Sequence, residues 1–123
     1  MYTIEQEAHG KVLILRYAGD MTLAEAVALR HTLETLLRET AAQDVVLDLQ
    51  GVVQVDSSGL GALVSAKTLA RTISKRLMLH QQPAHVTALL ARTGINDFFP
   101  TLENEDDLWW RTMHEEPDAA TQA

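Results

Sequence analysis

The feature that most constrains the fold is a nearly continuous apolar run at residues 44–49, Asp-Val-Val-Leu-Asp-Leu. Apolar and polar side chains do not alternate along this run, so it predicts a central strand buried on both faces, as in a parallel sheet. Residues 22–38 before it and residues 57–73 after it carry apolar side chains at helical spacing. A buried strand between two amphipathic helices predicts an α/β fold.

An opening hairpin precedes this unit. We predict strands over residues 2–7 and 12–18, joined at His9-Gly10 and closed by Gly19-Asp20. The later elements that we predict are a strand over 77–80, a helix over 83–93 with Gly94 just past its end, a short edge strand or core plug at Phe98-Phe99, and a helix over 104–113. The chain should therefore form a mixed β-sheet, with the opening hairpin followed by alternating helices and strands.

The length and composition limit the class of protein. The 123 residues fit one compact domain, which we place at residues 1–113, followed by a disordered acidic tail at 114–123. There is no cysteine, no export signal and no apolar stretch long enough to cross a bilayer, so we expect a cytoplasmic protein without membrane insertion. The net charge of −7 opposes binding to nucleic acid.

Few residues have the spacing that catalysis or metal binding needs. His80 and His85 lie on different predicted elements without a third ligand, so structural histidines are expected rather than a metal site. A Gly-x-Ser-x-Gly elbow and a Walker-type phosphate loop are both absent. We therefore expect neither an enzyme nor a resident cofactor.

Ser57 is the strongest candidate for a functional residue. It lies where the strand segment ending at Val55 passes through Asp56 into a helix, and functional sites of α/β sheets lie at this end of a strand. Gly59 and Gly61 would let another molecule approach, and a phosphate on Ser57 would meet free N–H groups of the helix. On the residues alone, however, an ordinary helix cap is the favoured interpretation of this segment.

Three stretches together resemble STAS-domain anti-sigma-factor antagonists. They are residues 47–61 (Leu-Asp-Leu-Gln-Gly-Val-Val-Gln-Val-Asp-Ser-Ser-Gly-Leu-Gly), residues 15–20, and residues 83–95 with Phe98-Phe99. The resemblance implies that Ser57 is phosphorylated. It also implies that the partner is held by residues around Ser57, namely Asp20, Thr22, Asp56, Ser58, Gly59, Leu60 and Gly61.

The same resemblance implies a protein partner. The unphosphorylated protein would bind an anti-sigma factor that is also a serine kinase of the histidine-kinase-like ATPase fold. Phosphorylation would release that partner, and a PP2C-type phosphatase would reset the switch. The negative charge added by a phosphate would oppose docking.

Thr22 departs from the pattern of that family. Its members usually carry an acidic residue at this position, where it helps to hold the partner. Here Thr22 is predicted to be the N-cap of the first helix, in a capping box with Glu25. This departure keeps open an alternative function, a constitutive STAS subunit of a lipid-transport ABC complex or of another multiprotein assembly.

Overall fold

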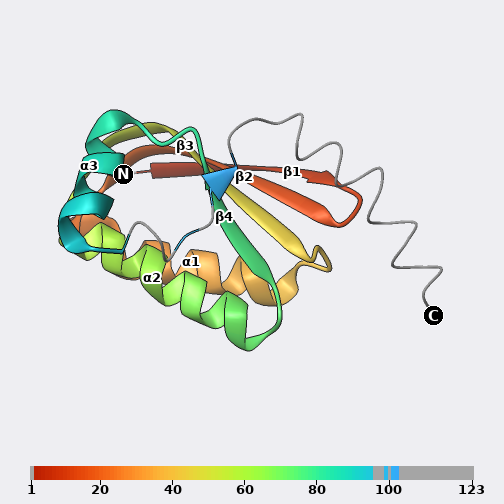
Figure 1. The fold of residues 1–123 in the computed structure, drawn as a ribbon. Helices are drawn as coiled ribbons and strands as arrows, with labels where there is room; N and C mark the ends of the chain where they lie inside the picture. Colours follow the sequence, from red (N-terminus) through yellow and green to blue (C-terminus); the bar gives the residue numbers. More distant parts are fainter. Residues whose placement is uncertain (1, 96–98, 100, 103–123) are drawn as a thin grey trace.

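The computed structural model describes residues 2–95, 99 and 101–102, which form a five-stranded sheet covered by helices (Figure 1). The strands follow one another across the sheet in chain order. The first pair is antiparallel and every later pair is parallel, so the predicted mixed sheet with an opening hairpin is confirmed. The strands are β1 (Tyr2–His9), β2 (Val12–Met21), β3 (Asp44–Val55), β4 (Arg76–His80) and β5 (Thr101–Leu102).

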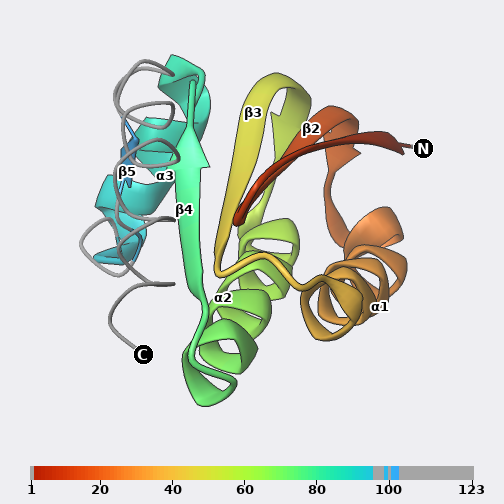
Figure 2. The same ribbon diagram turned by 90° about the vertical axis from the view of Figure 1, so that its right-hand side faces the viewer.

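Three helices accompany the sheet. Helices α1 (Leu23–Glu39) and α2 (Ser57–Thr72) run side by side beneath it, whereas α3 (Ala84–Thr93) lies beside β4, away from α1 (Figure 2). The predicted order of the first eight elements is confirmed. The helix predicted over 104–113 and the tail over 114–123 lie outside the described residues. None of the described helices is long and apolar enough to span a membrane.

Strand β3 has the environment that its sequence predicts. Val45 and Leu47 face the helices and belong to the main core, whereas Val46 packs with three apolar side chains of β2 and β4 on the other face. The two carboxylates of the run are buried but paired. Arg76 Nη2 lies 2.9 Å from Asp44 Oδ2, and Arg16 Nη1 lies 2.8 Å from Asp48 Oδ2. These pairs let aspartate occupy a buried strand.

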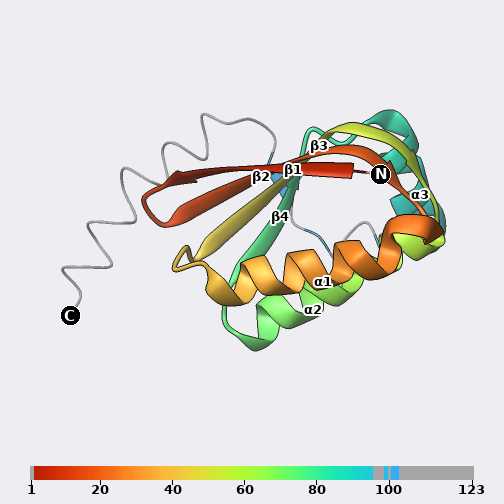
Figure 3. The ribbon, with the colours of Figure 1, turned by 180° about the vertical axis from the view of Figure 1, so that it is seen from behind.

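The end of β2 differs from the prediction. Gly19-Asp20 does not close the hairpin region, because β2 continues to Met21 and Gly19 pairs with Val52 of β3. The register between the strands shifts here, and Gly19 has a φ of 124°, which glycine adopts without strain. The longer strand carries the chain to the start of α1, beside the start of α2 (Figure 3).

The prediction at Phe98-Phe99 is partly confirmed. Phe99 is buried in the main core, as the core-plug alternative requires, whereas Phe98 lies outside the described residues. The short strand at the β4 side of the sheet is β5, which begins two residues further along the chain than Phe99. The short edge strand was therefore misplaced by the prediction, since two adjacent aromatic residues favour strand and core equally.

Candidate functional site at the start of helices α1 and α2

Asp56 connects the first turns of α1 and α2. Its Oδ1 accepts hydrogen bonds from the backbone N–H groups of Ser58 (2.9 Å) and Gly59 (3.0 Å), which cap α2. Its Oδ2 accepts a hydrogen bond from the N–H of Leu23, the first residue of α1, at 3.1 Å. The N–H of Gly59, followed by those of Leu23 and Ser58, holds the pKa of this carboxyl below its usual value. One charged side chain thus fixes the two helix starts relative to each other.

Ser57 is the first residue of α2 and is exposed to solvent, whereas Ser58 is half-buried. No hydrogen bond of the Ser57 hydroxyl occurs within the described part of the chain. One expectation about this site was wrong. The N–H groups of Ser58 and Gly59 are not free to bind a phosphate, because they already donate to Asp56. A phosphate on Ser57 would instead add negative charge beside a carboxylate.

The two glycines of the motif have different roles. A Cβ at Gly59 would lie 1.9 Å from the Met21 backbone oxygen, so this residue lets α2 pack tightly on the end of β2. A Cβ at Gly61 would meet nothing within 4 Å. The prediction that both glycines clear an approach for a partner therefore fits Gly61 only. Leu60 is also buried, with 3% of its surface exposed, so its side chain supports the fold.

Thr22 is the N-cap of α1, and the predicted capping box is present. Oε1 of Glu25 accepts hydrogen bonds from the Thr22 N–H at 3.1 Å and from the Thr22 hydroxyl at 2.7 Å. These hydrogen bonds lower the pKa of Glu25, with that of the Thr22 hydroxyl as the largest cause. Nearby, the backbone carbonyl of Asp20 accepts a hydrogen bond from the hydroxyl of Tyr17. The structure thus brings the predicted residues Asp20, Thr22, Asp56, Ser57 and Ser58 to one end of α1 and α2.

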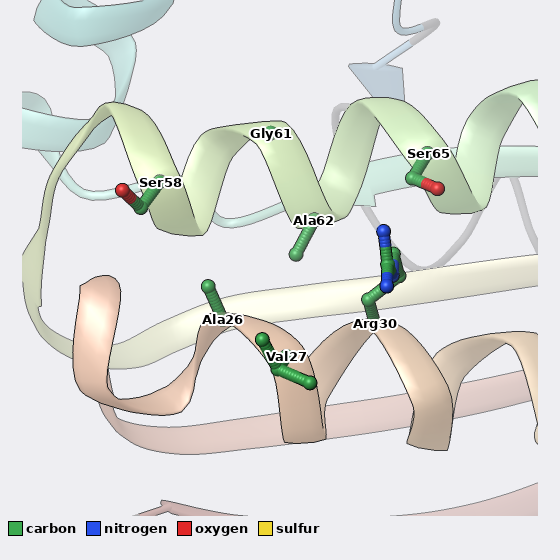
Figure 4. A pocket seen from close by; sticks show the side chains of 7 residues that line it. All are labelled: Ala26, Val27, Arg30, Ser58, Gly61, Ala62 and Ser65. Carbon is green, nitrogen blue, oxygen red and sulfur yellow. The ribbon is translucent and has the colours of Figure 1, made fainter.

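The structure also shows a groove that we did not predict. This α1–α2 groove has a volume of about 170 Å³ (Figure 4). Figure 4 shows Ala26 and Ala62 pointing toward each other across it, with Ser58 near one end and Arg30 near Ser65 at the other. The residues that line it are Ala26, Val27, Arg30, Ser58, Gly61, Ala62 and Ser65.

Exposed apolar side chains lie along the first part of α1, and one of them, Val27, lines the groove. Leu23 and Val27, one helical turn apart, expose 71% and 72% of their surfaces. The sequence carried a signal for them, because both fall outside the buried helical stripe that contains Leu29 and Leu33. Large exposed apolar side chains that gather at one place mark interaction sites.

His80 and His85 have different environments. His80 is buried in β4, whereas His85 is exposed on α3. Within residues 2–95, 99 and 101–102, no group of three or more His, Cys, Asp or Glu side chains is placed to hold a metal ion. The candidate site is the protein surface around Ser57.

Comparison with known protein families shows which family the chain belongs to. A family model described as "Mlab, STAS domain" matches residues 4–103, most of the chain. The chain belongs to the STAS domain family. A curated relative of this STAS domain is the anti-sigma F factor antagonist of Paenibacillus polymyxa, which is 26% identical over 102 residues. That match covers 83% of this chain and 87% of the relative.

Solved structures share the fold of this STAS domain. An anti-sigma factor antagonist from Mycobacterium paratuberculosis has a TM-score of 0.76 at 19% identity, over 92% of this chain and 95% of that one. The Bacillus cell fate determinant SpoIIAA in its phosphorylated form has a TM-score of 0.64 at 14% identity, over 88% and 96% of the two chains. The resemblance to anti-sigma factor antagonists seen in the sequence is confirmed.

Proposed function

We propose that this STAS domain is an anti-sigma factor antagonist that binds its partner through the first turns of α1 and α2 and releases it when Ser57 is phosphorylated. The observation that carries the proposal is the placement of Ser57, which is exposed at the start of α2 while its neighbours are held by Asp56. The curated relative named as an anti-sigma F factor antagonist supports the same function.

The partner in this proposal is an anti-sigma factor that is also a serine kinase of the histidine-kinase-like ATPase fold. The kinase supplies nucleotide, metal ion and catalysis, and Ser57 supplies the acceptor hydroxyl. A PP2C-type phosphatase then removes the phosphate. In this role the protein is a substrate and a binding module rather than an enzyme.

Charge explains how the switch works. A phosphoserine at position 57 carries about −1.5 to −2 charge units at neutral pH. It would lie next to the Asp56 carboxylate, whose hydrogen bonds keep it ionised. The added charge must be desolvated when a partner docks, and it repels any acidic group of that partner. Phosphorylation therefore weakens binding without unfolding the helix.

The test is to incubate the protein with its candidate kinase and ATP and to locate the phosphate by mass spectrometry. We expect one phosphate on Ser57, none on Ser57→Ala, and normal phosphorylation of Thr68→Ala, which removes another exposed hydroxyl of α2. Binding should be weakened in Ser57→Asp and retained in Ser57→Ala. Phosphate on Ser58 alone would move the switch by one residue, and tight binding by Ser57→Asp would contradict the charge mechanism.

A constitutive STAS subunit of a multiprotein assembly is the second candidate function. Thr22 favours it, because a neutral side chain bonded to Glu25 stands where the antagonists usually present an acid. In that case the partner complex would form equally well with wild type, Ser57→Ala and Ser57→Asp, and no kinase would modify Ser57. Measuring the three affinities side by side distinguishes the two functions.

A further inference from the structure

Arg30 provides the free positive charge of the α1–α2 groove. Its side chain lines the groove and is exposed, and its guanidinium makes no hydrogen bond or ion pair with any part of the chain that the structure describes. A guanidinium presents five N–H donors in a planar fork that matches a carboxylate. An exposed guanidinium beside a groove can therefore receive an anionic group from another molecule.

The acidic side chains around the groove are engaged internally. Asp56 accepts three backbone N–H groups, and Glu25 accepts both donors of Thr22. Oε2 of Glu34 accepts a hydrogen bond from the Ser65 hydroxyl at 3.1 Å, across the two helices. These carboxylates keep their charge but already have donors, and none of them lines the groove, whereas Arg30 does.

Apart from Arg30, Ser58 and Ser65, the residues that line the groove are small and apolar. Ala26, Ala62 and Gly61 leave a space of about 170 Å³, and Val27 lies exposed at its edge. An apolar cavity of about 150 Å³ is large enough to hold benzene. The α1–α2 groove can therefore accept one aliphatic or aromatic side chain, with Arg30 beside it.

We propose that the α1–α2 groove binds an acidic segment of a protein partner, which inserts one apolar side chain between α1 and α2 and places a carboxylate on Arg30. This inference rests on the proposed function and specifies the chemistry of its partner.

The experiment uses a displayed library of short random peptides as the probe. Selection is carried out on the full chain as wild type, Arg30→Glu and Arg38→Glu, after thermal melts show that all three are folded. Arg38 is the matched control, because it is exposed on the same helix, two turns beyond the groove. The best peptide selected on the wild type is then synthesised and titrated against each protein.

Wild type and Arg38→Glu should enrich peptides with Asp or Glu next to an aliphatic or aromatic residue, whereas Arg30→Glu should enrich Lys or Arg in place of the acid. Affinity for the synthesised peptide should fall about tenfold or more in Arg30→Glu, a loss of about 1.4 kcal/mol, and less than about twofold in Arg38→Glu. Added salt should weaken binding to the wild type.

The proposal is overturned by any of three results: no enrichment, enrichment of basic or uncharged peptides on the wild type, or the same acidic peptides on Arg30→Glu. Self-association of the chain that Val27→Asp abolishes would assign the groove to a second copy and would also overturn it. These outcomes leave the kinase assay on Ser57 unaffected, so failure here is distinct from failure of the proposed function.

Discussion

The tight packing of Gly59 can be tested by adding a single methyl group. In Gly59→Ala the new Cβ would lie 1.9 Å from the Met21 carbonyl oxygen and 2.5 Å from its carbonyl carbon. Both are backbone atoms, so no side-chain rotation relieves the clash. The end of β2 and the first turn of α2 must separate by about 1 Å to reach an allowed contact distance. The expected result is a loss of stability.

The size of this loss follows from two opposing effects. Overpacking a well-filled interior costs about 1–3 kcal/mol, whereas alanine in place of glycine in a helix gains at most about 1 kcal/mol. We expect Gly59→Ala to lower the free energy of unfolding by about 1–2 kcal/mol net. For a domain of this size, that corresponds to a fall in Tm of roughly 4–8 °C.

Gly61→Ala is the matched control, because a Cβ at Gly61 meets nothing within 4 Å. There the helix propensity acts alone, so Tm should rise by a few degrees, as expected for about 0.5–1 kcal/mol. Thermal melts followed by circular dichroism measure both variants. An unchanged or higher Tm for Gly59→Ala would refute the close packing of α2 on β2. A fall in Tm for Gly61→Ala would show that the space beside Gly61 in the α1–α2 groove is filled.

Three further predictions concern the helix starts and the chain end. Asp56→Asn should lower Tm at pH 7. Hydrogen bonds hold the pKa of Asp56 below its unfolded value of about 3.9, so its stabilisation is complete above that pH and is lost as pH falls through the folded pKa. In urea titrations, the free energy of unfolding should therefore fall less steeply with acid in Asp56→Asn than in the wild type. Thr22→Asp should lower Tm, since it cannot donate to Glu25 and adds a second carboxylate, whereas Thr22→Ser should not; thermal melts compare them. Ending the chain after Glu115 should leave both Tm and partner binding unchanged, and a fall of several degrees would contradict this.

The elements with a strong local signal could be predicted from the sequence. The apolar run of β3 has no alternation and is buried on both faces, and Thr22 with Glu25 forms the capping box that its spacing indicates. The extension of β2 through Gly19 could not be predicted, because Gly-Asp is a strong turn signal. Pairing with β3 overrides that signal, and such pairing between distant segments leaves no local pattern.

The candidate site was predictable in position but not in detail. The motif around Ser57 located it at the start of a helix, and the structure places it there. Two contacts with distant residues were missed. Asp56 bonds Leu23, 33 residues earlier in the chain, and Gly59 packs on Met21. The α1–α2 groove was missed for the same reason, because its walls come from two helices whose relative placement the sequence does not state.

The structure reconciles the two interpretations of the Asp-Ser-Ser-Gly segment. An ordinary helix cap and a phosphate acceptor compete only if one residue must serve both purposes. Here Asp56 accepts the N–H groups that need a cap, and this leaves the hydroxyl of Ser57 exposed and without a capping role. A modification of Ser57 would therefore change the charge of the surface while the cap that holds α1 and α2 together stays in place. This separation of roles is what a reversible switch requires, because both states must remain folded to be interconverted.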